Sequence, residues 1–184
     1  MSTLASKGQL RASFLRWALF TVPACILLGF FSGQIGEGPG SIWFQTLEKP
    51  SIYPDPMWFG IVWTILFTLE GIALALICAA WGARGRTAAI VMFAIQFFAA
   101  LSWTPVFFTT HEMTLSLYLL FAVIVLVVIT IALFWRVRKL AALLLLPYLA
   151  WICFATLLNY EFLRLNPDAD GVEDPTRAVQ RFEI

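Results

Sequence analysis

Apolar residues occupy five long stretches of the chain, separated by short polar or charged segments. The stretches cover residues 14–31, 56–80, 87–109, 113–135 and 140–163. Each holds about 18–25 residues, the length that an α-helix needs to cross a hydrocarbon layer about 30 Å thick. The pattern predicts an all-α integral membrane protein, a bundle of five transmembrane helices within residues 1–166.

One connection between these stretches, residues 32–55, is much longer than the others. It contains several glycines and then large apolar side chains, among them Trp43. Long loops in compact folds are usually functional or disordered. Because this one is partly apolar, we expect a lid that folds over the mouth of the bundle as a short interfacial helix. Lys49-Pro50 should end that helix, since the residue before a proline disfavours the α conformation.

The boundaries of the second predicted helix and of the bundle itself also have sequence signals. Asp55 followed by Pro56 is typical of a helix N-cap with proline at the first helical position. After residue 166 the chain becomes polar and acidic. Residues 167–184 are therefore predicted to be a mobile polar tail.

The charged residues are few and are sorted by side. Charged residues make up 12% of the chain, against about 25% in an ordinary soluble domain, and the net charge of +1 offers no basic face for nucleic acid. By the positive-inside rule the amino terminus is cytoplasmic and the carboxyl terminus is outside. The prediction depends on eight of the twelve basic residues, which fall on one side: Lys7, Arg11, Arg16, Arg84, Arg86, Arg136, Arg138 and Lys139.

The tryptophans divide into two groups by their depth in the predicted helices. Trp63, Trp103 and Trp151 lie inside their stretches, about 9–15 Å below the outer surface for a rise of about 1.5 Å per residue. Three tryptophans on three helices therefore converge in the outer half of the bundle. Four others lie near helix ends and fit the aromatic belt of a membrane interface: Trp17, Trp58, Trp81 and Trp135.

Each deep tryptophan belongs to a stripe with helical spacing. Steps of three and four residues place the members of a stripe on one helix face. Two interpretations remain open, a tightly packed interior or a flat aromatic pocket under the long loop that suits a large planar ligand. The stripes are Trp63, Phe67 and Glu70; Gln96, Ala99/Ala100, Trp103 and Phe107; and Tyr148, Trp151, Ala155, Asn159 and Phe162.

Several short motifs resemble the TspO/MBR family, which comprises bacterial tryptophan-rich sensory proteins and the mitochondrial translocator protein, once called the peripheral benzodiazepine receptor. The motifs are WTPVFF at 103–108, PYLAW at 147–151 and ATLLNY at 155–160, preceded by LEKPS at 47–51 and by Gly60-x-x-Trp63. They cover about residues 40–166 in the family's order and spacing.

The resemblance implies a five-helix bundle, often a homodimer, that binds porphyrins such as protoporphyrin IX and haem. It also implies sterols and isoquinoline-carboxamide or benzodiazepine-type drugs as ligands, in a cavity beneath the loop between the first two helices. Together with the stripes, it gives the expected ligand-binding residues: Trp43, Trp63, Phe67, Gln96, Trp103, Phe107, Tyr148, Trp151, Ala155 and Asn159.

Two further sets of residues take their roles from the resemblance. Trp63 and Trp151 correspond to family tryptophans implicated in light-dependent porphyrin breakdown. Leu158, Tyr160 and Arg164 occupy the places of a proposed cholesterol-recognition motif. That motif is weak by itself, and Tyr160 and Arg164 also fit the role of interfacial anchors.

The chain departs from the family pattern at Ile52, Asp55 and Ala100, where relatives often have tryptophan, proline and asparagine. Glu70 is not expected from the family either, and a carboxylate at this depth needs a partner. It could bind a cationic group of a ligand, relay a proton, face a neighbouring subunit or meet a buried water.

Three functions fit these observations. The first is a receptor or transporter-like protein that senses or regulates tetrapyrrole levels, with porphyrin as ligand and no obligatory cofactor. The second is an enzyme that degrades porphyrin with light and oxygen through Trp63 and Trp151, and the third is a regulatory scaffold. No metal site is expected, because the three cysteines have no ligand spacing and the sole histidine, His111, is typical of a surface turn and would lack a second axial ligand to haem.

Overall fold

The computed structural model describes residues 7–35 and 38–172. Over these residues the chain is mostly helical, and five segments are long and apolar enough to cross a membrane. The prediction of an all-α bundle of five spanning helices is confirmed. In chain order the elements are α1 (Lys7–Gly33), η1 (Gly38–Gly40), α2 (Ile42–Thr46), α3 (Pro56–Cys78), α4 (Arg86–Leu101), α5 (Trp103–Phe108), α6 (Met113–Val137), α7 (Lys139–Leu144), α8 (Leu146–Leu165) and η2 (Pro167–Ala169).

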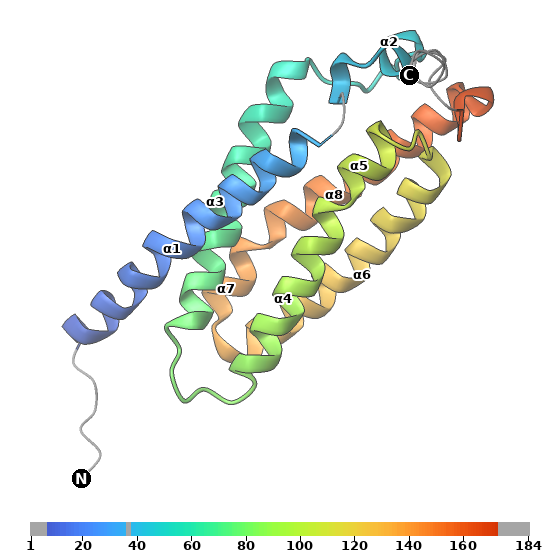
Figure 1. The fold of residues 1–184 in the computed structure, drawn as a ribbon. Helices are drawn as coiled ribbons and strands as arrows, with labels where there is room; N and C mark the ends of the chain where they lie inside the picture. Colours follow the sequence, from blue (N-terminus) through green and yellow to red (C-terminus); the bar gives the residue numbers. More distant parts are fainter. Residues whose placement is uncertain (1–6, 36–37, 173–184) are drawn as a thin grey trace, which may run out of the picture.

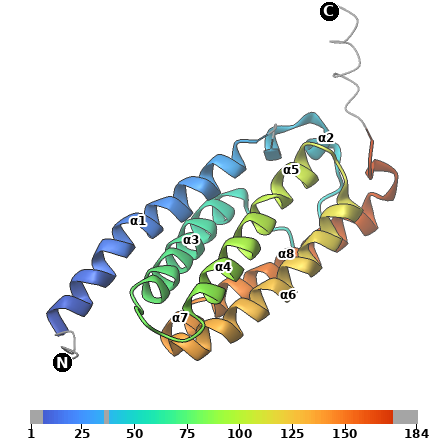
Figure 2. The ribbon, with the colours of Figure 1, turned by 60° about the horizontal axis from the view of Figure 1, so that its bottom comes forward.

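The spanning segments form a bundle with α1 at one edge and α6 on the far side (Figures 1 and 2). Helix α1 packs chiefly along α3, and α6 packs along both α4 and α8. Helix α3 lies against α7 but has few contacts with α8, which follows α7 along the same spanning segment. Helices α3 and α8 therefore diverge, and the space between them belongs to the outer half of the bundle.

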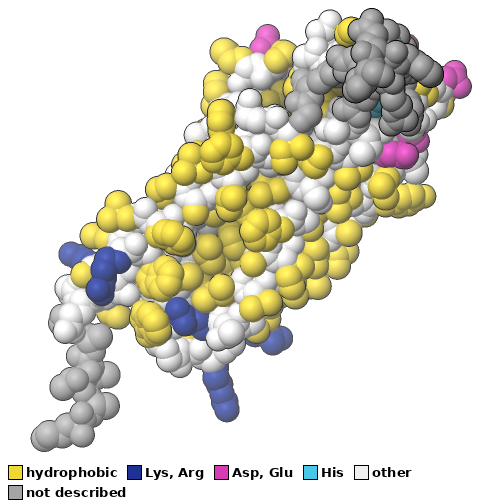
Figure 3. Space-filling view, in the orientation of Figure 1, with side chains coloured by type: hydrophobic (Ala, Val, Ile, Leu, Met, Phe, Trp, Pro, Cys, Tyr) yellow, Lys and Arg dark blue, Asp and Glu magenta, His cyan; other side chains and the backbone are white. Residues whose placement is uncertain are grey.

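Charged side chains separate to the two ends of the bundle (Figure 3). Lysines and arginines gather at the end that holds the α3–α4 and α6–α7 connections, which we call the inner end. Aspartates and glutamates gather at the opposite end, which carries α2 and η2 and which we call the outer end. This arrangement agrees with the orientation predicted from the positive-inside rule.

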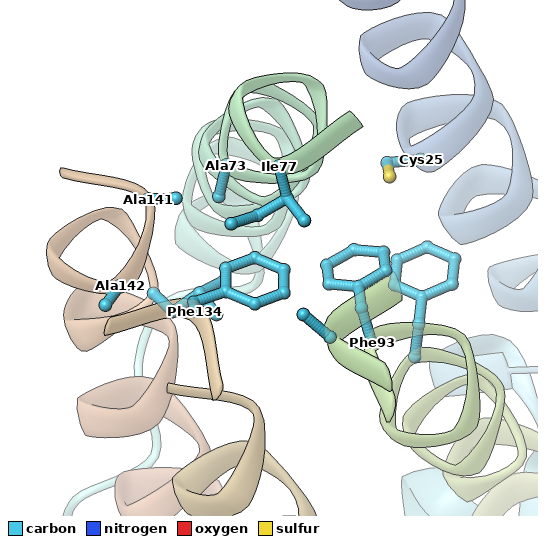
Figure 4. Packing of buried hydrophobic residues seen from close by; sticks show 10 residues of the cluster. Cys25, Ala73, Ile77, Phe93, Phe134, Ala141 and Ala142 are labelled. Carbon is cyan, nitrogen blue, oxygen red and sulfur yellow. The ribbon is translucent and has the colours of Figure 1, made fainter. Parts of the chain in front are cut away.

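The inner half of the bundle is closed by a hydrophobic cluster of aromatic and small side chains (Figure 4). Phe93 of α4 and Phe134 of α6 stack with their ring centroids 6.0 Å apart. Alanines let neighbouring helices approach closely, as is usual between helices in membranes. The labelled members of the cluster are Cys25, Ala73, Ile77, Phe93, Phe134, Ala141 and Ala142.

Prolines divide two of the spanning segments, which the hydrophobic pattern predicted as continuous helices. Pro105 has no N–H to donate to the carbonyl of Leu101, so the helix is interrupted at Ser102, between α4 and α5. The hydroxyl of Ser32 in α1 donates to that Leu101 carbonyl at 2.7 Å. The last segment is divided in a similar way between α7 and α8, two residues before Pro147.

Other boundaries differ from the predicted ones by a few residues. Helix α1 begins at Lys7, before the apolar stretch, because hydropathy marks only the part of a helix that suits lipid. Helix α2 ends at Thr46, before Lys49-Pro50, since Leu47 already has extended backbone angles. The predicted start of α3 is confirmed, because the Asp55 carboxylate accepts the Met57 N–H at 2.9 Å.

The first part of the segment predicted as a mobile tail packs against the bundle. The Asp170 carboxylate accepts the N–H of Thr114 at 3.1 Å and also its hydroxyl, and the Gly171 N–H donates to the His111 carbonyl at 2.9 Å. Thr114 at the start of α6 and the backbone of His111 in the turn before it thus hold the segment after α8 against the bundle, and this part of the prediction is corrected. The rest of the predicted tail, 173–184, lies outside the described residues.

Candidate functional site

A cavity of about 380 Å³ lies in the outer half of the bundle. Its wall comes from α1, α3, α5, α8 and the segment 38–55, which we call the lid, and apolar side chains dominate its lining. The volume falls within the range of about 300–1,000 Å³ that is usual for small-molecule sites. Seven of the predicted ligand-binding residues line it: Trp63, Phe67, Trp103, Phe107, Trp151, Ala155 and Asn159.

Two indoles form a corner in the cavity wall where α3 and α8 diverge. The rings of Trp63 and Trp151 lie at 87° to each other with their centroids 6.4 Å apart. Trp63 also stacks on Phe67 at 5.2 Å, and Phe59 meets Trp151 edge-on at 6.0 Å. A flat aromatic ligand could stack on one indole and meet the other at its edge, both of which are favoured arrangements of aromatic rings.

Asn159 fixes the third cavity tryptophan in place. Its side-chain oxygen accepts the indole N–H of Trp103 at 3.0 Å and the hydroxyl of Ser116 at 2.8 Å. Its amide nitrogen donates to the Met113 carbonyl at 2.9 Å. These bonds occupy the polar atoms of Asn159 and hold the Trp103 ring stacked on Phe107, with centroids 5.1 Å apart. Asn159 and Trp103 therefore shape the wall and offer a ligand mainly ring surface.

Two polar groups of the lid, Lys49 and Tyr53, lie in or next to the aromatic wall of the cavity. The Lys49 ammonium lies 4.1 Å from the ring centroid of Phe44 and donates to the carbonyls of Phe44 and Leu47. Burial lowers the pKa of Lys49. Burial, and then the nearby Asp55 carboxylate, raise the pKa of the Tyr53 hydroxyl, which lines the cavity and stays neutral at pH 7.

Trp43, predicted to bind ligand, lies outside the cavity lining and joins the lid to the rest of the outer end. Its indole N–H donates to the Ala169 carbonyl at 3.1 Å, and its ring stacks on His111 at 4.3 Å. His111 itself is only 4% exposed, so its interpretation as a surface residue was wrong. The His111 Nδ1 lies 2.8 Å from the Val172 carbonyl, which ties the lid, the α5–α6 turn and the C-terminal segment together.

Gln96 and Tyr148 also lie outside the lining, one to two turns nearer the inner end. The Gln96 amide donates to the Glu70 carboxylate at 3.1 Å, and both side chains are buried. Glu70 therefore does not face a neighbouring subunit, and its partner is an amide from α4. Tyr148 is buried where its ring meets Trp63 edge-on at 6.4 Å, so it supports the cavity wall from behind.

The three residues of the proposed sterol motif point in different directions. Leu158 is buried and lines the cavity, whereas Tyr160 is about half exposed on another face of α8. Arg164 pairs with Glu161 at 2.7 Å on the exposed surface. Among the residues described in the structure, no group of three His, Cys, Asp or Glu side chains could hold a metal ion.

Sequence reasoning missed the contribution of α1 and much of the lid. Ile26 and Phe30 of α1 line the cavity, as do Phe44 and Tyr53 of the lid. Helix α1 is apolar on nearly all sides, so its sequence does not indicate which face looks inward. The Lys49-Pro50 turn was the available signal for the lid, but it does not say where the aromatic rings point.

The sequence is similar to known proteins over most of its length. The model of the TspO/MBR family matches residues 21–165. A protein of Chlorobaculum tepidum named tryptophan-rich protein TspO is 38% identical over 144 residues, 78% of this chain and 91% of that protein. The human translocator protein is 34% identical over 142 residues, 76% of this chain and 84% of the human protein. The tryptophan-rich sensory protein of Cereibacter sphaeroides is 34% identical over 124 residues, 67% of this chain and 77% of that protein.

Proposed function

The chain belongs to the TspO/MBR family and is a multi-pass membrane protein, and on that premise we propose that it is a receptor for porphyrins. The observation that carries the proposal is the cavity in which Trp63, Trp103 and Trp151 meet beneath the lid. A sensor or regulator of tetrapyrrole levels needs such a site, because its ligand must be held without being consumed. Sterols and isoquinoline-carboxamide or benzodiazepine-type drugs are further candidate ligands for the same apolar walls.

The chemistry of a porphyrin suits the two parts of this site. Its ring is a rigid aromatic plate, which can bury large area against indole and phenyl rings at little cost in conformational entropy. Its propionates lie at one edge and must remain hydrated or paired with a cation. The cavity supports this orientation, because aromatic residues line it, Tyr53 of the lid belongs to its lining, and the Lys49 ammonium lies over the lining ring of Phe44.

The test is a titration of the detergent-purified protein with protoporphyrin IX in the dark, followed by tryptophan fluorescence. We expect quenching that saturates, and that is weakened at least tenfold when Trp63 and Trp151 are both replaced by leucine. The matched control replaces Trp58 and Trp135, which are about half exposed near opposite ends of the bundle. Linear quenching that is the same in all variants would indicate partitioning into micelles and would refute the proposal.

A second function is favoured by the contact between Trp63 and Trp151, whose rings lie 6.4 Å apart in the lining. A bound porphyrin that absorbs light would lie against both indoles, with dissolved dioxygen as the oxidant. This photo-oxidative degradation predicts that the porphyrin absorbance bleaches under light in air, and that Trp63→Phe or Trp151→Phe abolishes the bleaching while dark binding remains. Quenching without bleaching would leave the receptor function alone.

A further inference from the structure

One basic side chain of the outer end, that of Lys49, lies against two rings that line the cavity, those of Phe44 and Phe162. Two basic residues lie at the outer end among residues 7–35 and 38–172, Lys49 and Arg164, and Arg164 is already paired with Glu161 at 2.7 Å. In the same described part of the chain, Lys49 has no carboxylate within ion-pair distance. Among the described residues, the ammonium is therefore a cation without an anionic partner.

The position of the ammonium is fixed by the lid. It donates to the Phe44 and Leu47 carbonyls at the end of α2, so two of its three N–H groups already have acceptors. Partial burial lowers the pKa of Lys49. The third N–H remains for an acceptor that approaches at the outer end, and a charged acceptor forms a stronger hydrogen bond with an ammonium than a neutral one does.

The rings over which this ammonium lies belong to the cavity wall. The Lys49 nitrogen lies 4.1 Å from the ring centroid of Phe44 and 5.8 Å from that of Phe162, and both rings line the cavity. A plate that stacks against the cavity walls would therefore bring its outer edge toward Lys49.

We infer that Lys49 is a specificity-determining residue that selects planar ligands with a carboxylate at one edge. The inference rests on the proposed function, and it names the ligand class more narrowly, as acidic and amphiphilic. The alternative role for Lys49 is purely structural, because the two carbonyls that it meets lie at the C-terminal end of α2 and a lysine there also stabilises the helix.

The experiment separates charge recognition from support of the lid by changing the ligand as well as the protein. Dark fluorescence titrations of the full chain would use protoporphyrin IX and its dimethyl ester, which has the same ring without the carboxylates. Lys49→Met removes the charge, and Lys49→Arg keeps it. Lys139→Met is the matched control, since Lys139 lies 5.6 Å from the Trp135 ring at the inner end.

We expect Lys49→Met to weaken binding of the free acid about tenfold, as for the loss of one hydrogen bond between charged groups, and to leave the ester within twofold. Lys49→Arg and Lys139→Met should leave both ligands within about threefold of the wild type. Equal weakening of acid and ester by Lys49→Met, or no weakening of either, would overturn the inference. If the wild type bound neither ligand saturably, the proposed function would fail first.

Discussion

Helices α1 and α3 meet in close backbone contact at Gly71, so Gly71→Ala should drive them apart. A Cβ at this position would lie 2.6 Å from the Cα of Val22 and 3.0 Å from the carbonyl oxygen of Thr21. Ordinary contacts begin near 3.4 Å, so α1 would have to move by roughly 0.8 Å. Backbone atoms cannot yield as a flexible side chain can, and the strain falls on the helix pair.

The magnitude follows from three contributions. Overpacking a well-packed interior costs about 1–3 kcal/mol. The same displacement lengthens the bond from the Thr21 hydroxyl to the Gly71 carbonyl, now 2.7 Å, and such bonds between membrane helices contribute about 0.6 kcal/mol. Alanine recovers up to about 1 kcal/mol through its higher helix propensity. The net loss of stability should be about 1–3 kcal/mol.

Thiol labelling of Cys25 is a direct assay, because Cys25 lies in α1 and is only 3% exposed. Cys78→Ala and Cys153→Ser would leave it as the single thiol. If α1 must separate from α3 before Cys25 can react, the labelling rate of Gly71→Ala should rise roughly 5- to 150-fold. Gly60→Ala in the same helix is the control, since an added Cβ there meets nothing within 4 Å and should not speed labelling.

A labelling rate for Gly71→Ala that equals that of Gly60→Ala would refute the reasoning, because it would mean that α1 and α3 are not in backbone contact at this point. A faster rate in both variants would show instead that α1 responds to any change in α3. The two results can be distinguished without knowledge of a ligand.

Three further substitutions test other contacts. Gln96→Leu removes the amide that donates to Glu70 and should lower the unfolding free energy in mixed micelles by about 1–3 kcal/mol. The double variant with Glu70→Leu should recover part of this loss, and losses that simply add would contradict the pairing of the two side chains. Trp43→Phe keeps an aromatic ring but loses the hydrogen bond from the indole N–H to the Ala169 carbonyl, so the exchange rate of lid amide hydrogens should rise several-fold. An unchanged exchange rate would show that this bond does not stabilise the lid. Asp55→Ala removes the N-cap of α3 and should cost about 1 kcal/mol in the same unfolding measurement, whereas Asp55→Asn should cost far less.

The number and order of spanning helices could be predicted from the sequence because each apolar stretch is long enough to cross a bilayer on its own. The breaks at Ser102 and Leu145 could not be predicted from hydropathy, although Pro105 and Pro147 were visible. A proline within a membrane helix can be accommodated by a neighbouring donor, and here Ser32 from a helix distant in sequence supplies it to Leu101.

The candidate site was predictable where helical spacing alone places a residue. The places of Trp63, Trp103 and Trp151 in the cavity lining could be predicted, because the sequence indicates both the helix face and the depth of each. Gln96 and Tyr148 share those faces but lie deeper, since a stripe does not say where a cavity ends.

Residues of the lid could not be placed by the same reasoning, because a loop has no repeating geometry. Trp43 turns away from the cavity to meet His111 and Ala169, whereas Phe44, its neighbour, lines it. The Lys49 ammonium lies over the Phe44 ring because it donates to the carbonyls of Phe44, in α2, and of Leu47, which follows it. These positions depend on tertiary contacts with α5, α8 and the segment after α8.

The central claim, that a porphyrin occupies the cavity between α3, α5 and α8, is tested most directly by filling the cavity. Ala155 lines it, whereas Ala150, in the preceding turns of α8, is exposed on the outside of the bundle. Dark titrations with protoporphyrin IX should show that Ala155→Phe abolishes saturable quenching and that Ala150→Phe preserves it, with both variants equally stable to heat. Binding that survives in Ala155→Phe with wild-type affinity would contradict the account and place the ligand elsewhere.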